Sequence, residues 1–281
     1  MGASGRVHGL SAPRGRRREN LYCLRLMAET ANPKLVVTGC SKQFGETAAL
    51  APTDLLIMPR EFVSIVGPSG CGKSTLFNIV SGLVEPDAGR ILIDGRDATG
   101  TPGHVGYMLQ KDLLIPWRSV VDNITLSAAL TRGVSKADRT EAVAFARRYG
   151  LGDFLDHYPH ALSGGMRQRV ALMRTLATRH DLLLLDEPFG ALDSQTRLEM
   201  QLWLLEVWHE TQRTILFVTH DIDEAILLSD RVLVMSPRPG RIASKLAIDL
   251  PRPRTLKQMT EPAFMGVKRE ILGLLHGTAA A

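Results

Sequence analysis

The sequence lacks any apolar stretch long enough to cross a lipid bilayer. A membrane-spanning helix needs about 20 consecutive apolar residues, and runs such as the leucine segment 182–185 are far shorter. A short run of this kind is typical of a buried strand. We therefore expect any role at a membrane to depend on a partner protein.

Cysteine is also scarce. The three cysteines, Cys23, Cys40 and Cys71, lack the spacing of a metal site, and their odd number argues against a disulfide framework. This favours a reducing compartment. No apolar segment follows the basic residues near the N-terminus, as it would in a secretory signal.

Positive charge is lacking outside the N-terminal region. The net charge is +5, but residues 1–33 contain six arginines and two glutamates, so the rest of the chain carries only +1. A nucleic-acid-binding surface needs a basic patch on the folded part, and we expect no such partner. Residues 1–33 show no hydrophobic periodicity and are expected to be a disordered basic tail, unless translation starts at Met27.

From residue 34 onward, short apolar runs alternate with helical periodicity. We expect strands at 35–38, 61–66, 90–94, 105–108, 182–186, 214–219 and 231–235. We expect helices at 73–84, 122–130, 136–149, 165–176, 195–211 and near 264–275. Such alternation predicts an α/β fold with a mostly parallel sheet covered on both faces.

The predicted domain covers residues 34–250 and is interrupted by an all-helical insertion over about 113–180, where strand signals vanish. Residues 251–281 form a short C-terminal extension. No internal repeat is present, so we expect one such domain and not two.

The strongest motif is the glycine-rich segment 67–74, GPSGCGKS, between a predicted strand and a predicted helix. It matches the phosphate-binding pattern G-x-x-x-x-G-K-[ST]. Glycines let the backbone wrap round an anion, Lys73 supplies a charge for the β- and γ-phosphates, and Ser74 can ligate Mg²⁺. The alternative is a glycine-rich turn without a ligand. The candidate phosphate-binding residues are Gly67, Pro68, Ser69, Gly70, Cys71, Gly72, Lys73, Ser74 and Thr75.

Two consecutive acids stand at the carboxyl end of the predicted buried strand 182–186, where open α/β sheets bind ligands. Asp186 is placed to hold Mg²⁺, and Glu187 to orient and deprotonate an attacking water. Taken alone, such a pair often marks only the end of a strand.

Residues 162–166, LSGGM, resemble the LSGGQ signature of the ABC ATPase family, with Met166 in place of the usual glutamine. Ser163 is also a good N-cap for the helix 165–176, and the glycines at its start would form a second anion site. The resemblance implies a P-loop NTPase fold: a RecA-like core, an antiparallel β subdomain and an inserted helical signature subdomain. It further implies that two copies pair head to tail, each ATP lying between Lys73 of one copy and Ser163, Gly164 and Gly165 of the other.

The resemblance extends to single residues elsewhere in the chain. It implies that Phe44 stacks on adenine, that Gln110 contacts Mg²⁺ and senses the γ-phosphate, that Asp193 lies in a loop crossing the dimer interface, and that His220 binds the γ-phosphate. Phe44 as a core aromatic is the alternative for that residue, and a metal site with Asp221 and Asp223 is the alternative for His220.

Segments 105–110, 116–118 and 236–241 look like those of nitrate, sulfonate and taurine importer ATPases, and 111–114 is shared with importers of thiamine precursors (hydroxymethylpyrimidines). This implies an ATPase that uses ATP and Mg²⁺, is peripheral to the cytoplasmic face of the inner membrane, and works with transmembrane permease subunits and, indirectly, a solute-binding protein. The apolar loop 113–117 would receive a permease helix, unless it packs in the core.

Two other functions remain open at this point. A soluble ABC ATPase of the DNA repair or translation type usually has two cassettes or a long coiled coil, and this chain has neither signal. An ATP-binding module without catalysis would not need Glu187 and His220.

Overall fold

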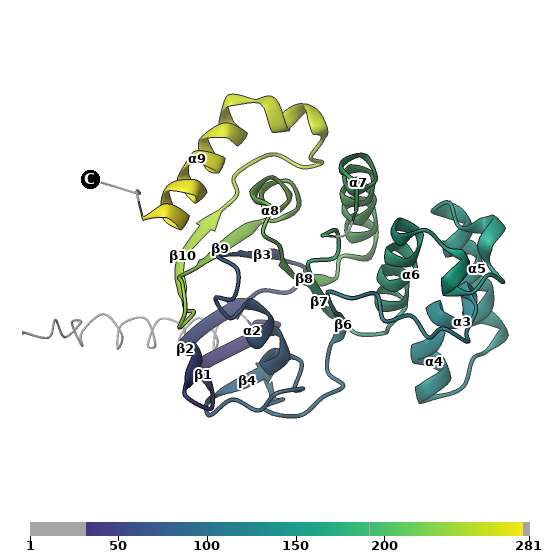
Figure 1. Cartoon of the computed structure of the whole chain (residues 1–281), viewed down its shortest axis with the longest axis horizontal. Coiled ribbons are helices and arrows are strands. Elements are labelled where there is room, and N and C mark those ends of the chain that lie inside the picture. Colours follow the sequence, from purple (N-terminus) through teal and green to yellow (C-terminus); the bar gives the residue numbers. More distant parts are fainter. Residues whose placement is uncertain (1–31, 191, 278–281) are drawn as a thin grey trace, which may run out of the picture.

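The computed structural model describes residues 32–190 and 192–277 (Figure 1). The predicted basic tail and the alternative start at Met27 lie outside the described residues, apart from residues 32 and 33. The described part forms two β-sheets and a group of helices that extends to one side of them (Figure 1).

The larger sheet has the strand order β10-β9-β3-β8-β7-β6 and is parallel except for the edge pair β10 and β9. Its strands are β3 Phe62–Val66, β6 Gly106–Met108, β7 Leu182–Asp186, β8 Thr214–Val218, β9 Arg231–Met235 and β10 Ile242–Ala247. The predicted mostly parallel sheet is therefore confirmed. Its central strands are buried on both faces, which explains their continuous apolar sequences.

The smaller sheet is antiparallel, with the order β2-β1-β4-β5. Its strands are β1 Leu35–Phe44, β2 Thr47–Ile57, β4 Ala88–Ile93 and β5 Arg96–Asp97. Asp94 and Gly95 both have positive φ and form the hairpin turn between β4 and β5, as predicted from the Asp-Gly pair.

Helix α2, Lys73–Val80, packs between the two sheets, and alternate residues of the central strands face opposite cores. Leu182 and Leu184 of β7 face α2 and the smaller sheet, whereas Leu183 and Leu185 face the other helices. The helices between β6 and β7 are α3 Val120–Ile124, α4 Leu126–Thr131, α5 Lys136–Arg148 and α6 Gly164–Leu176. After β7 come α7 Ser194–Thr211, α8 Ile222–Leu228 and α9 Pro262–His276.

Several predicted boundaries were wrong for identifiable reasons. Strands β2 and β10 were not predicted: β2 contains Pro52 and pairs with register shifts, and β10 is a largely exposed edge strand. Helix 73–84 ends at residue 80, because the positive-φ Gly82 turns the chain against the backbone of Thr101. The helix predicted at 122–130 is two helices, separated at Thr125.

The C-terminal segment is fastened to the larger sheet by a buried arginine. Arg254 is only 5% exposed, and its guanidinium donates hydrogen bonds to backbone carbonyls of the α8 region, including Ile226, and to that of Ile248 after β10. Arg252 pairs with Asp230 and lies over the Trp208 ring. The segment predicted as a C-terminal extension thus packs on α8 and β9.

We expect the substitution Arg254→Met to lower the free energy of unfolding by about 3 kcal/mol, because it leaves several buried carbonyl groups without a donor. Urea denaturation followed by circular dichroism measures this. Lys257→Met, at an exposed position of the same segment, is the control and should change stability by less than about 0.5 kcal/mol. An unchanged midpoint for Arg254→Met would show that Arg254 does not hold this segment.

Candidate functional site

The glycine-rich segment 67–74 joins β3 to α2, as the motif requires. Gly72 has φ of +110°, and a Cβ there would lie 2.6 Å from the Ala49 carbonyl oxygen, so a larger residue would displace the backbone. Gly72 precedes the first helical residue of α2 without a side-chain cap, so N–H groups of the first turn remain available to an anion. Lys73 is 7% exposed and its Nζ donates to the carbonyls of Gly67 and Pro68 at 2.8 and 3.0 Å.

Asp186, the last residue of β7, lies buried beside this segment, 4% exposed. Burial raises the pKa of Asp186, whereas a hydrogen bond from Ser74 and the charge of Lys73 act in the opposite direction. A hydroxyl and a carboxylate that meet in this way are the hard oxygen donors that Mg²⁺ prefers. Within the described part of the chain, no cluster of three or more His, Cys, Asp or Glu residues could hold a metal, so a bound Mg²⁺ would need further oxygens from its ligand or from water.

Glu187 brings two other predicted residues together. Its Oε2 lies 3.3 Å from Nε2 of Gln110, which follows β6, and 3.3 Å from Nδ1 of His220, which follows β8. The Glu187 backbone has a positive φ of 46°, a conformation that is uncommon outside glycine. A hydrogen bond of 2.9 Å from its N–H to the Val218 carbonyl holds it there.

These groups open onto one cleft of about 360 Å³ at the carboxyl ends of the parallel strands. The sequence predicted most of its lining, and two lining residues, Ala49 and Arg238, were missed. The predicted lining residues are Ser69, Gly70, Gly72, Lys73, Ser74, Thr75, Gln110, Glu187 and His220. Arg238 follows β9 by three residues, just as the other polar residues follow their strands, and this position is the signal that could have revealed it.

Other candidates lie elsewhere in the chain. Phe44 is 50% exposed at the end of β1, with Lys42 Nζ 5.7 Å from its ring centroid, so the alternative of a core aromatic is wrong. Ser163 caps α6 through Met166 N–H, as predicted, and lies exposed away from this cleft together with Gly164. Asp193 caps α7, and hydrogen bonds from Thr196 and Gln195 lower its pKa.

The alternative metal site around His220 is not supported by its neighbours. Asp221 accepts hydrogen bonds from the N–H groups of Asp223 and Glu224 and so caps α8. Asp223 forms an ion pair of 2.8 Å with Lys268 of α9. Both carboxylates are thus committed to holding helices in place.

The apolar loop after Gln110 divides between core and surface. Leu114 is buried, whereas Leu113 and Trp117 are exposed, Trp117 to 76%. Arg174 of α6 donates to the carbonyls of Leu113 and Asp112, at 2.7 and 2.6 Å. The loop is therefore attached to α6 while presenting two large apolar side chains to solvent.

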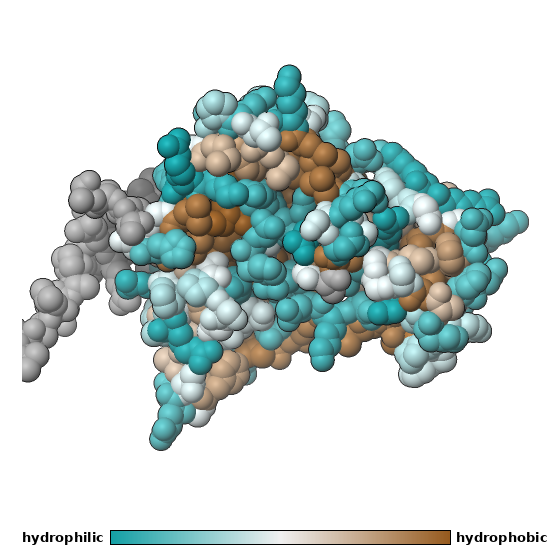
Figure 2. All heavy atoms as spheres, turned by 45° about the horizontal axis from the view of Figure 1, so that its top comes forward, coloured by the Kyte–Doolittle hydropathy of each residue, from teal (hydrophilic) through white to brown (hydrophobic). Residues whose placement is uncertain are grey.

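Within the described residues, no helix combines the length and apolar character needed to span a bilayer. In the view of Figure 2, hydrophobic residues form separate patches divided by hydrophilic ones, without a continuous apolar belt.

Comparisons with known proteins identify the family of this chain. The family described as ABC transporter matches residues 50–190. An uncharacterised ABC transporter ATP-binding protein of Methanocaldococcus jannaschii is 44% identical over 247 residues, covering 86% of this chain and 91% of that protein. The taurine import ATP-binding protein TauB of Rhizobium johnstonii is 43% identical over 245 residues, covering 84% and 92%.

Among solved structures, the ATP-binding cassette MJ0796, dimeric and bound to ADP and Pi in a post-hydrolysis state, superimposes with a TM-score of 0.68. It is 31% identical in sequence, and the match covers 76% of this chain and 98% of that one. The fold is thus that of the P-loop NTPases, as the sequence predicted. The chain belongs to the ABC transporter family, as an ATP-binding subunit that hydrolyses ATP.

Proposed function

We propose that this chain energises the import of a small polar or anionic solute, of the nitrate, sulfonate, taurine or thiamine-precursor kind, by hydrolysing ATP in the cleft at the phosphate-binding segment. The observation that carries the proposal is the convergence of Lys73, Gln110, Glu187 and His220, from four separate segments, on one cleft. The likeness to a taurine import ATP-binding protein supports the solute class.

Each side chain has a role that its position allows. Lys73 binds the β- and γ-phosphates, within the N–H groups of the segment 67–75. Ser74 and Asp186, with Gln110, would hold Mg²⁺, which would neutralise phosphate charge. Glu187 orients and deprotonates the attacking water, and His220 contacts the γ-phosphate.

We further propose that the working unit contains two copies of the chain. Ser163 and Gly164 are exposed at the start of α6 and do not line the cleft of their own chain. In a head-to-tail pair they would reach the ATP in the other copy, with Gly165 behind them and Asp193 at the interface. Phe44, exposed at the edge of the smaller sheet, would stack on the adenine ring.

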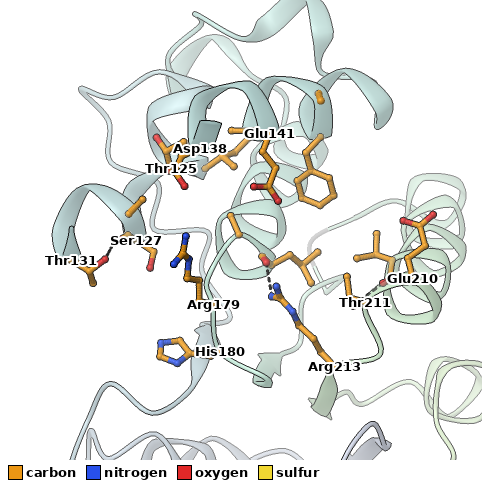
Figure 3. A pocket seen from close by; sticks show the side chains of 18 of the residues that line it. Thr125, Ser127, Thr131, Asp138, Glu141, Arg179, His180, Glu210, Thr211 and Arg213 are labelled. Atoms are coloured by element: carbon orange, nitrogen blue, oxygen red, sulfur yellow. Dashed lines mark hydrogen bonds between the residues drawn. The ribbon is translucent and has the colours of Figure 1, made fainter. Parts of the chain in front are cut away.

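A second, larger cavity lies among the helices. It has a volume of about 510 Å³ and lies between α4 and α5 on one side and α7 with the segment 176–180 on the other (Figure 3). Apolar side chains such as Phe145, Leu176 and Val207 line it. We propose that it receives a helix of the permease at the cytoplasmic face of the inner membrane.

Filling this cavity should separate permease binding from ATP binding. Ala128 of α4 lines the cavity, whereas its neighbour Ala129 does not. We expect Ala128→Trp to lower co-purification with the permease at least about tenfold, by steric exclusion, and to leave the affinity of the isolated chain for ATP unchanged. Ala129→Trp is the matched control and should keep both. Normal co-purification of Ala128→Trp would show that the permease binds elsewhere.

The transported solute needs a separate test. In proteoliposomes containing the permease, this chain and the solute-binding protein, ATP hydrolysis should rise only with the cognate solute. Taurine, nitrate, an alkylsulfonate and a hydroxymethylpyrimidine are the compounds to compare. ATP hydrolysis that no permease or solute changes would favour the soluble, non-transport ABC ATPase that the sequence left as the alternative.

A further inference from the structure

The loop between β9 and β10, residues 236–241, is pressed against the phosphate-binding segment. Gly240 N–H donates to the Ala49 carbonyl at 3.2 Å, and its own carbonyl accepts from Ala51 N–H at 2.9 Å. A Cβ on Gly240 would lie 1.8 Å from the Cys71 carbonyl oxygen, so the two backbones are in contact and only glycine fits. The loop therefore has a fixed position relative to the phosphate-binding segment.

This loop also has internal hydrogen bonds that fix its shape. The Ser236 hydroxyl accepts from Arg241 N–H at 3.2 Å, and the backbone N–H of Ser236 donates to the Arg241 carbonyl at 3.0 Å. The residues between them project from the end of the larger sheet, beside the segment 67–74.

Arg238 points from this loop into the nucleotide cleft. Its Nε donates to the Gly70 carbonyl at 3.0 Å, and a Cβ on Gly70 would lie 3.2 Å from its Nη2, so the guanidinium lies directly over Gly70. The side chain is exposed, lines the same cleft as Lys73 and forms no ion pair within the described part of the chain. The hydrogen bond from Nε anchors the guanidinium, and neither Nη atom forms a hydrogen bond within the described residues.

Arg238 adds positive charge to the cleft. Lys73 and Arg238 are the lysine and arginine side chains that line it, together with the carboxylate of Glu187. The phosphate chain of a nucleoside triphosphate carries more negative charge than the single positive charge of one lysine can neutralise. An anchored guanidinium presents parallel N–H donors in a fork that matches two phosphate oxygens, which an ammonium group does not.

We propose that Arg238 binds the phosphate chain of the nucleotide as a second cationic residue beside Lys73. It belongs to the β9–β10 loop and not to the phosphate-binding segment. The proposal rests on the placement of the nucleotide under "Proposed function". It adds a residue 168 positions from Gly70 to the machinery that binds ATP.

The test is isothermal titration calorimetry of the full chain with ATP and with ADP, on Arg238→Gln. We expect the Kd for ATP to rise about tenfold and to depend less steeply on salt, since one charge is lost. Arg238→Lys should recover part of this affinity. The midpoint of thermal unfolding without nucleotide should stay that of the unmodified chain, because the substituted side chain is exposed.

Arg241 supplies the matched control. It lies on the same loop, carries the same charge, is exposed and does not line the cleft. Arg241→Gln should leave the Kd unchanged; an equal rise would mean a general charge effect and would overturn the inference. If Arg238→Gln binds normally while Lys73→Ala does not, the inference fails and the proposed function stands. If Lys73→Ala also binds normally, both fail.

Discussion

We expect Glu187→Gln to bind ATP but to hydrolyse it at least about 10²-fold more slowly. The amide has the size of the carboxylate and still offers an oxygen to Gln110 Nε2, which lies 3.3 Å from Glu187 Oε2. It cannot take a proton from water, so the chemical step loses its base. Because ATP remains intact, a dimer held together by the shared nucleotide should stay closed.

Phosphate release measures the first effect, and size-exclusion chromatography with MgATP measures the second. Glu85→Gln, at an exposed site away from the cleft, is the control and should hydrolyse ATP at the normal rate. The backbone at Glu187 has positive φ, so thermal unfolding should be measured to confirm that the substituted chain keeps its stability. Near-normal turnover of Glu187→Gln would remove this residue from the role of base.

Lys73→Ala should raise the Kd for ATP about 100-fold, the largest effect expected on binding. The Lys73 ammonium group, near the N-terminal end of α2, donates hydrogen bonds to the carbonyls of Gly67 and Pro68. It is therefore already in place where the β- and γ-phosphates would lie, and little ordering is needed when they bind. Its removal takes away the one charge that the phosphate-binding motif itself contributes.

Calorimetry with a non-hydrolysable ATP analogue measures this loss. Lys136→Ala, an exposed lysine at the start of α5, is the control and should bind the analogue normally. Unchanged affinity of Lys73→Ala would contradict the assignment of segment 67–74 as the phosphate-binding site.

The central part of the fold could be predicted from the sequence because its strands are buried on both faces. Strands β7 and β9 were predicted to the residue, since each is an uninterrupted apolar run with polar residues at its ends. Strand β10 could not be predicted in this way, because it lies at the edge of the sheet and only Leu246 among its residues is buried. It forms because it pairs with β9, and its own residues show no clear alternation of apolar and polar side chains.

The residues of the site likewise divide into those that their own sequence identifies and those that it does not. Lys73 and Glu187 belong to short motifs whose chemistry can be read from consecutive residues. Gln110 and His220 were assigned only through a resemblance, and the structure brings both within 3.3 Å of one Glu187 oxygen. Arg238 was missed because its relation to Gly70 arises only when two distant loops meet in three dimensions.

Two side chains of α6, Arg174 and Gln168, connect this helix to loops that follow β6 and β7. Arg174 grips the carbonyls of Asp112 and Leu113, a few residues beyond Gln110, and Gln168 donates to the Pro188 carbonyl, next to Glu187, at 2.6 Å. We therefore expect a displacement of the exposed loop that carries Leu113 and Trp117 to move α6, and with it the segment that follows Glu187. A single helix thus joins the surface loop to the residue next to Glu187.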